Sequence, residues 1–127
     1  MVGEIHPNIK VIRNDEFSVE EVIALKPSHI ILSPGPGRPE DAGIIEEVAK
    51  KCIDIPLLGV CLGHQAICDA YGATITYASE LMHGKQSEVS LDLGSKLLKD
   101  CDEKTVVARY HSLVVDPQTL PSSFKVT

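Results

Sequence analysis

The stretch that decides the fold is residues 56–65, Pro56-Leu57-Leu58-Gly59-Val60-Cys61-Leu62-Gly63-His64-Gln65. The apolar run 56–60 predicts a buried strand, and residues 64–71 predict a helix. A cysteine between the two, in a Gly-x-Cys-x-Gly frame, is typical of a nucleophile elbow, in which the reactive side chain stands at the start of a helix. Glycines suit so tight a turn because larger side chains would meet the neighbouring strands. Most free cysteines are buried structural thiols, but this frame favours a nucleophile at Cys61.

Strands alternate with helices upstream of this elbow. A short strand is predicted over residues 9–13, and Ser18-Val19-Glu20-Glu21 forms a capping box that begins a helix. Residues 29–32 predict a buried strand, and residues 44–51 predict a second helix. This order predicts an α/β fold, an open and mostly parallel sheet with helices on both faces.

The second half of the chain has a different character. Strands are predicted at residues 74–77, 88–91 and 105–109, with shorter links that suit antiparallel pairs. Residues 82–85 are predicted to form a polar, flexible insert between strands. Glu46 and Glu47, in the first half, are predicted to lie on a solvent-facing helix surface.

Composition restricts the classes of function. The chain has 127 residues, which suits one domain spanning residues 1–127, and a net charge of −6 without a basic cluster. Nucleic acid and anionic membranes are therefore not expected as partners. No apolar run reaches membrane-spanning length and the first residues lack a signal-peptide profile, so a cytoplasmic protein is predicted. The 4 cysteines lack the spacing of a metal site or a disulfide framework, and no metal or cofactor is predicted.

A second motif, Ser33-Pro34-Gly35-Pro36-Gly37-Arg38-Pro39, follows the predicted strand 29–32. Ligands of open α/β sheets bind beyond the carboxyl ends of the strands, where both this loop and the elbow are expected. A rigid proline-glycine loop can hold a backbone amide outward, as an oxyanion hole requires. A plain tight turn is the alternative, and a phosphate-binding P-loop is disfavoured because no Gly-Lys-Ser/Thr follows.

Several polar residues are candidates for other roles in such a site. Gln65 is a neutral donor and acceptor suited to an amide or a carboxylate, and Ser112 could contact substrate from a facing loop. His64 stands three residues after Cys61, but the elbow directs the thiol away from the helix body, which favours a structural role for this histidine. His111 is a candidate base by residue type, with a surface histidine as the alternative.

Four motifs together resemble the class I (triad) glutamine amidotransferases, and within them the glutaminase component II of anthranilate synthase and aminodeoxychorismate synthase. They occur in the family's order and spacing, and the resemblance covers essentially the whole chain. The motifs are residues 33–43, residues 59–67, Met82-His83-Gly84-Lys85 and Arg109-Tyr110-His111-Ser112-Leu113.

The resemblance implies a reaction and a set of roles. Cys61 would attack the side-chain amide of glutamine, releasing ammonia and forming a thioester that water hydrolyses to glutamate. Gly35 and Leu62 would supply the oxyanion hole. The implied glutamine-binding residues are Gly35, Pro36, Gly37, Gln65, Ser112 and Leu113.

The resemblance also implies a partner. Ammonia would pass to a chorismate-binding synthase subunit (component I), towards tryptophan or folate. His83, Gly84 and Lys85 are expected to contact that subunit. The choice between the two pathways lies in the partner.

The family pattern has segments that these residues lack. They are an opening central strand and a closing segment that carries the catalytic histidine and glutamate. We therefore expect a partial glutamine amidotransferase domain, truncated at both ends, that is inactive by itself and is marginally stable or aggregation-prone. The alternatives are a non-catalytic glutamine- or synthase-binding module and another cysteine hydrolase with an elbow.

Overall fold

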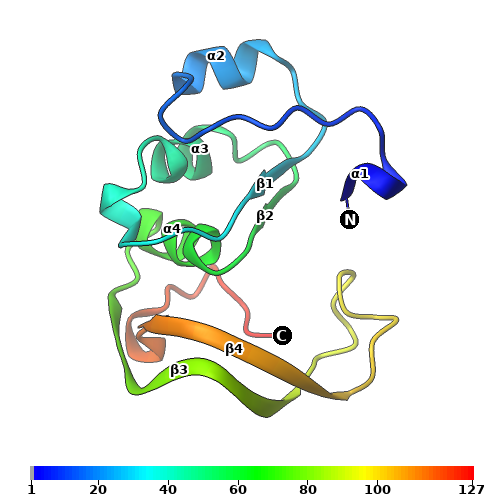
Figure 1. Cartoon of the computed structure of the whole chain (residues 1–127), viewed down its shortest axis with the longest axis vertical. Coiled ribbons are helices and arrows are strands. Elements are labelled where there is room, and N and C mark those ends of the chain that lie inside the picture. The colour runs from blue at the N-terminus through cyan, green and yellow to red at the C-terminus, as the bar shows by residue number, and fades with distance from the viewer. Residues whose placement is uncertain (1) are drawn as a thin grey trace. The chain divides into compact units, whose positions relative to one another are not determined.

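The N-terminal part of the chain is built on a pair of parallel strands. The computed structural model describes residues 2–127, with the side chains of all of these except Leu81 and Met82. Two units form, one ending at Ala70 and the other spanning Tyr71–Thr127. In the first unit, β1 (Ile30–Leu32) pairs in parallel with β2 (Leu57–Gly59), as Figure 1 shows. The predicted strands at residues 29–32 and 56–60, and their parallel pairing, are confirmed.

Helical elements complete the regular structure of the first unit. They are α1 (Val2–Ile5), α2 (Val19–Ala24), the 3-10 turn η1 (Pro39–Asp41), α3 (Ile45–Lys51) and α4 (Leu62–Ala70). The predicted capping box is present, because Ser18 Oγ accepts from the Glu21 amide and the Glu21 carboxylate accepts from the Ser18 amide. Buried side chains from α2, α3, α4 and β1 form one core, which includes Val19, Leu32, Val48 and Ala66. None of the helices in residues 2–127 is long and apolar enough to cross a bilayer.

Two glycines allow α4 to approach the strands closely. A Cβ atom at Gly63 would lie 2.3 Å from the carbonyl oxygen of Leu32 on β1. A Cβ atom at Gly59, the last residue of β2, would lie 2.6 Å from the backbone of Gly63. Real Cβ atoms do not come so close to backbone atoms, so only glycine permits this packing.

The two faces of the strand pair differ. Leu32 is buried in the helix-covered core and Ile30 and Leu57 pack against it, as expected for one face of a pleated pair. On the opposite face, Ile31 is 49% exposed and Leu58 is 39% exposed. The strand residues on both faces are therefore apolar, as is typical of a parallel sheet that is covered on both sides.

The strand predicted at residues 9–13 does not form. These residues follow α1 as irregular chain, and Glu16 and Arg13 close a turn through the bond from the Glu16 amide to the Arg13 carbonyl, 3.2 Å. A strand needs a neighbour with which to share a ladder, and β1 pairs only with β2 among the described residues. The prediction was wrong because β-strand formation depends on a partner as well as on apolar residues.

The second unit is a long antiparallel ribbon. β3 (Ile75–Ser90) pairs with β4 (Lys104–Val115), and the 3-10 turn η2 (Pro117–Thr119) follows. The predicted strands 74–77 and 88–91 are therefore two ends of one strand. Residues 82–85, predicted as a flexible insert, belong to β3, and Tyr110 to Leu113, predicted as a loop, belong to β4. These predictions were wrong because local polarity does not reveal a ladder between segments distant in the sequence.

The ribbon is irregular where the candidate residues lie. Tyr77 pairs with Leu113 and Met82 with His111, so residues 78–81 lie opposite the single residue Ser112. A second register shift falls between His83 and Lys85, where Gly84 has a φ of 68°. Such bulges bend a strand and redirect its side chains.

Glu46 departs from the prediction that it lies on a solvent-facing surface. Its Oε1 atom is buried without a hydrogen-bond partner among the described residues, and its carboxyl group lies within hydrogen-bonding reach of Asp69 on α4. Burial, followed by the charge of Asp69 and the hydrogen bond with it, raises the pKa of Glu46 above its ordinary value. Lys50 opposes this shift and Glu40 adds to it.

Replacing Glu46 with glutamine should change how stability depends on pH. A carboxyl whose pKa is raised on folding contributes stability that is lost as pH rises from its unfolded value of 4.5 through the folded value. We expect Glu46→Gln to reduce this loss of stability with rising pH. At neutral pH it should raise the free energy of unfolding by about 1 kcal/mol, because the amide donates to Asp69 without ionising. Urea unfolding between pH 4 and pH 8 measures both effects. The exposed neighbour variant Glu47→Gln should keep the fall, and an identical fall in Glu46→Gln would contradict the prediction.

Gly63→Ala should test the close approach of α4 to β1. The added methyl group must displace the Leu32 backbone, so we expect a loss of about 2–3 kcal/mol in the free energy of unfolding, as for an overpacked core. Gly3→Ala is the control, since its Cβ would meet only Ile9 Cδ1, at 3.8 Å. Urea unfolding at one pH compares the two, and equal stabilities would refute the packing argument.

Candidate active site

Cys61 occupies a strained turn between β2 and α4. Its φ of 53° lies in the left-handed region, which residues other than glycine rarely adopt. Its side chain is exposed, whereas Leu62 and Gly63, which follow it, are buried. The strand–turn–helix geometry predicted from the Gly-x-Cys-x-Gly frame is confirmed, and such backbone strain is commonly concentrated at functional sites.

Backbone hydrogen bonds hold this turn in place. The Gln65 amide donates to the Cys61 carbonyl at 3.0 Å, which is the first bond of α4, and the Gly63 amide donates to the Val60 carbonyl at 3.1 Å. Cys61 is therefore the residue that caps the helix. The amides of a first helical turn have no partner within the helix, so the thiol lies beside donors suited to a negative charge.

The proline-glycine loop meets the elbow, as the topology rule predicted. A Cβ atom at Gly35 would lie 2.8 Å from Cδ2 of Leu62, so the two residues are direct neighbours. Residues 33–37 are exposed, and Gly37 has a φ of 81°. Pro39 is buried at the start of η1 and anchors the end of the loop. Gly35 and Leu62, the predicted oxyanion-hole pair, thus stand together beside Cys61.

Gln65 and His64 are neighbours on α4 that differ in exposure. Gln65 is only 7% exposed and belongs to the buried face of the helix, which places its amide inside the unit. His64 is exposed at the surface, and its Nε2 atom lies 3.7 Å from Sγ of Cys68, one turn further along α4. Partial loss of water around the imidazole lowers the pKa of His64, and burial raises the pKa of the Cys68 thiol.

The contact between His64 and Cys68 is a feature that sequence reasoning missed. The signal was available, because residues four apart on a helix face one another. This contact directs the imidazole along the helix body, in agreement with a structural role for His64.

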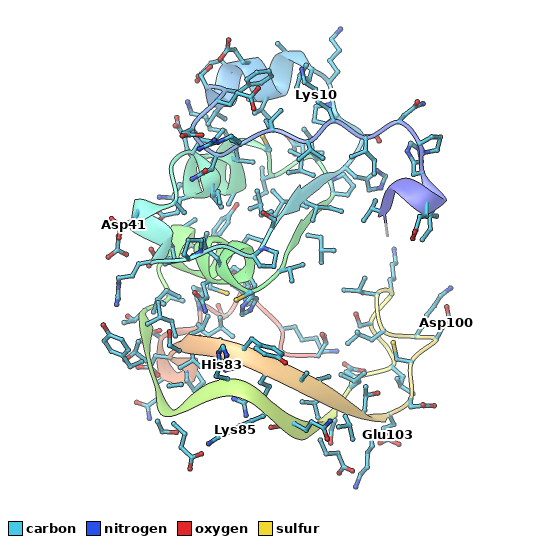
Figure 2. All side chains as sticks on the ribbon, viewed as in Figure 1. Lys10, Asp41, His83, Lys85, Asp100 and Glu103 are labelled. Atoms are coloured by element: carbon cyan, nitrogen blue, oxygen red, sulfur yellow. The ribbon has the colours of Figure 1, made fainter. Side chains whose placement is uncertain are left out.

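The other candidate residues belong to the β3–β4 ribbon. His83 stacks edge-on against Tyr110, with ring centroids 5.4 Å apart, and Lys85 Nζ lies 3.0 Å from Glu80 Oε2. The side chains of His83 and Lys85 are labelled on this ribbon in Figure 2. Ser112 is exposed and Leu113 is 8% exposed. These residues belong to the second unit, and the expectation that some of them share a site with Cys61 stays a prediction.

His111 has a partner of its own in the ribbon. Its Nε2 atom lies 3.2 Å from Nη2 of Arg109, whose Nη1 donates to Ser87 Oγ at 3.2 Å. Alternate residues of a strand share a face, which explains why Arg109 and His111 meet. In residues 2–127, no group of three or more His, Cys, Asp or Glu side chains is arranged to hold a metal ion.

The chain is similar to known proteins over its whole length. The family model for glutamine amidotransferase class-I matches residues 1–127. The aminodeoxychorismate/anthranilate synthase component 2 of Bacillus subtilis is 42% identical over 127 residues, covering 99% of this chain and 65% of that protein. The anthranilate synthase component 2 of Pseudomonas aeruginosa is 47% identical over 130 residues, covering 98% and 62%. The chain therefore spans less than two thirds of the length of these relatives.

A fused relative and a solved structure extend the comparison. The bifunctional protein TrpGD of Thermotoga maritima is 43% identical over 129 residues, covering 99% of this chain and 22% of that protein. The crystal structure of a putative GMP synthase subunit from Thermoplasma acidophilum has a TM-score of 0.72 at 23% identity, covering 89% of this chain and 55% of that one. This likeness confirms the predicted fold class. With the match to the family model, it leads to one conclusion: the chain belongs to the class-I glutamine amidotransferase family.

Proposed function

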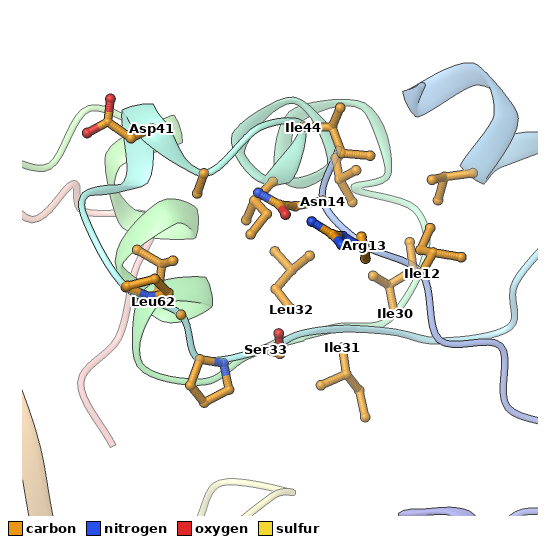
Figure 3. A pocket seen from close by; sticks show the side chains of 17 residues that line it. Ile12, Arg13, Asn14, Ile30, Ile31, Leu32, Ser33, Asp41, Ile44 and Leu62 are labelled. Carbon is orange, nitrogen blue, oxygen red and sulfur yellow. The ribbon is translucent and has the colours of Figure 1, made fainter. Parts of the chain in front are cut away.

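We propose that Cys61 is the nucleophile of a glutaminase reaction that releases ammonia from glutamine. The observation that carries this proposal is the exposed thiol in a left-handed turn at the start of α4, where the next residue, Leu62 (labelled in Figure 3), contacts Gly35. Membership of the class-I glutamine amidotransferase family and the names of the component 2 relatives support the same chemistry.

The proposed reaction uses the elbow in two steps. The Cys61 thiolate attacks the side-chain carbonyl carbon of glutamine, and the tetrahedral oxyanion accepts hydrogen bonds from the Leu62 and Gly35 amides. Collapse of this intermediate breaks the C–N bond, the nitrogen takes up the proton that the thiol lost and leaves as ammonia, and a thioester remains. Water then attacks the thioester, giving glutamate and restoring the thiol.

The other predicted site residues are proposed to recognise the substrate. Pro36 and Gly37 continue the exposed loop beside the elbow, where they can border the glutamine side chain. Gln65, Ser112 and Leu113 would hold the α-amino and α-carboxylate groups. In this proposal Ser112, which is exposed opposite the bulge, turns its hydroxyl toward the substrate.

The ammonia is proposed to reach a chorismate-binding synthase subunit in the cytoplasm, for anthranilate or aminodeoxychorismate synthesis. The names of the relatives support a second component, and both products appear among those names. The proposed contact consists of His83, Gly84 and Lys85, since all three are exposed and lie at a register shift of the ribbon. A negatively charged chain with no basic cluster fits a protein partner better than a nucleic acid.

Proton transfer needs a general acid or base close to Cys61, and three of the histidines have other contacts. The rings of His64, His83 and His111 contact Cys68, Tyr110 and Arg109, respectively. A positioned general base or acid contributes about 100- to 10,000-fold to such reactions. We therefore propose that this 127-residue chain, taken alone, forms the thiol adduct but does not turn glutamine over.

A glutamine analogue that carries an electrophilic diazoketone should label Cys61. We expect the intact mass to rise by one adduct, and peptide mapping to place it on Cys61 because the elbow exposes that thiol beside amide donors. Cys61→Ser should abolish the adduct, and free glutamine should protect against it. Cys101→Ser is the matched control, since Cys101 is the other exposed free cysteine. Labelling of Cys101 in place of Cys61 would refute the assignment.

Ammonia release should then separate an enzyme from a binding module. We expect release by the chain alone to be no faster than release by Cys61→Ser, while the analogue still labels Cys61. The measurement is coupled detection of ammonia and glutamate at saturating glutamine. Turnover that depends on Cys61 would contradict the proposed inactivity. Saturable glutamine binding without any labelling would favour the non-catalytic alternative.

A further inference from the structure

The guanidinium of Arg109 forms a hydrogen-bonded bridge across the β3–β4 ribbon. Its Nη1 atom donates to the hydroxyl of Ser87 on β3 at 3.2 Å. Its Nη2 atom lies 3.2 Å from Nε2 of His111, on the same face of β4. Ser87 is paired with Val107 in the ladder, so Arg109 reaches a diagonal neighbour on the opposite strand. One side chain thus joins the two strands and holds an imidazole ring.

The contact with Arg109 fixes the position of the hydrogen on the His111 ring. A guanidinium has five N–H donors and no acceptor, so the imidazole nitrogen must be the acceptor in this bond. Nε2 therefore carries a lone pair, and the neutral ring has its hydrogen on Nδ1. A protonated ring has a donor on both nitrogens and would offer the guanidinium no acceptor. The bond consequently selects one tautomer of a neutral His111.

This tautomer makes His111 unsuited to act as a base. Nδ1 already holds a hydrogen, and the lone pair of Nε2 accepts from Arg109. To take the proton of a thiol, the ring would have to give up that bond and carry a positive charge beside the guanidinium. Two like charges at such a separation repel each other. The interpretation of His111 as a base, which its residue type allowed, is therefore disfavoured by its surroundings.

The planar fork of Arg109 suits the bridge better than a lysine would. Its two Nη atoms reach two different partners, whereas a lysine side chain ends in a single nitrogen. The cation opposite Arg109 in the ladder is Lys85, and its ammonium is paired with Glu80 at 3.0 Å. Both acceptors of Arg109 are neutral, so the bridge depends on hydrogen-bond geometry.

The bridge lies next to the irregular part of the ribbon. His111 is paired with Met82, which directly follows the bulged residues 78–81. These bulged residues stand opposite Ser112, and the ladder of the described residues gives Ser112 no paired residue of its own. A bulge disrupts the ladder locally, so side-chain bonds gain importance beside it. Arg109 fastens β4 to β3 through the residue that directly precedes Ser112.

We propose that Arg109 is a positioning residue of the glutamine site, which acts through His111 on Ser112. It holds the His111 ring neutral, with its hydrogen on Nδ1, and it ties β4 to β3 beside the bulge. His111 then supports Ser112 and takes no part in proton transfer. This inference rests on the proposed function, in which Ser112 holds the α-amino and α-carboxylate groups of glutamine.

Heteronuclear NMR of the His111 ring in the full chain tests the tautomer. At about pH 8, above the ordinary imidazole pKa, we expect a protonated Nδ1 and an unprotonated Nε2. Arg109→Met keeps the length of the side chain but removes its donors, so the hydrogen should move largely to Nε2, its usual place in free histidine. Lys104→Met is the matched control, since this cation of β4 lies 3.5 Å from Glu88, and it should keep the tautomer of the parent chain.

A parent ring with its hydrogen on Nε2 would overturn the proposal, and this result does not depend on any variant. Hydrogen exchange then tests the support for Ser112. We expect exchange at the amides of residues 111–113 to be at least fivefold faster in Arg109→Met, with residues 105–107 unchanged within twofold. Unchanged exchange at residues 111–113 would contradict the positioning role. If Arg109→Met does not fold, Ser87→Ala removes one end of the bridge and should give the same local increase.

Protection of Cys61 by glutamine tests the link to the substrate. The thiol is alkylated with iodoacetamide at increasing concentrations of free glutamine. The glutamine concentration that halves alkylation should be at least fivefold higher in Arg109→Met than in the parent chain or Lys104→Met. Equal protection in all three would overturn the positioning role. Absence of protection in the parent chain would instead overturn the glutamine site itself, and the NMR result would still decide the tautomer of His111.

Discussion

The structure depends on the absence of a side chain at Gly59 and at Gly63, the two positions where α4 meets the parallel strands most closely. Gly59 ends β2 against the backbone of Gly63, and Gly63 rests on the carbonyl of Leu32. Because the helix starts directly on the strands, the chain must turn sharply between Gly59 and Leu62. Cys61 takes the left-handed conformation that this turn requires. Packing, the turn and the exposed thiol are thus consequences of one steric constraint.

The parts of the fold that could be predicted from the sequence are those that local interactions specify. Residues 56–70 combine an apolar run, two glycines and a helical pattern within a short stretch, so local interactions specify the strand, the turn and the helix. The capping box at Ser18 is local in the same sense. Residues 9–13 and 82–85 are different, because a strand is defined by its partner. The first segment has no ladder partner in the described part of the chain, and the second pairs with β4, which is distant in the sequence.

The sequence likewise predicted some features of the candidate site and missed others. The neighbourhood of Gly35 and Leu62 followed from topology, since loops after parallel strands meet at one edge of a sheet. The inward position of Glu46 could not be predicted, because it depends on how α3 and α4 rotate against each other. The link between His64 and Cys68 was within reach of helix periodicity. Ser112 and Leu113 lie in the other unit, so sequence similarity alone relates them to Cys61.

The φ of Cys61 has a consequence for how the protein could be stabilised. A left-handed conformation costs a residue with a Cβ atom about 1–2 kcal/mol, whereas glycine adopts it freely. A glycine at this position would relax the backbone and delete the thiol in a single step. Selection of variants by thermal stability alone would therefore favour the loss of the proposed nucleophile. At this residue stability and reactivity oppose each other, and any screen of the chain needs a readout of the thiol beside its melting temperature.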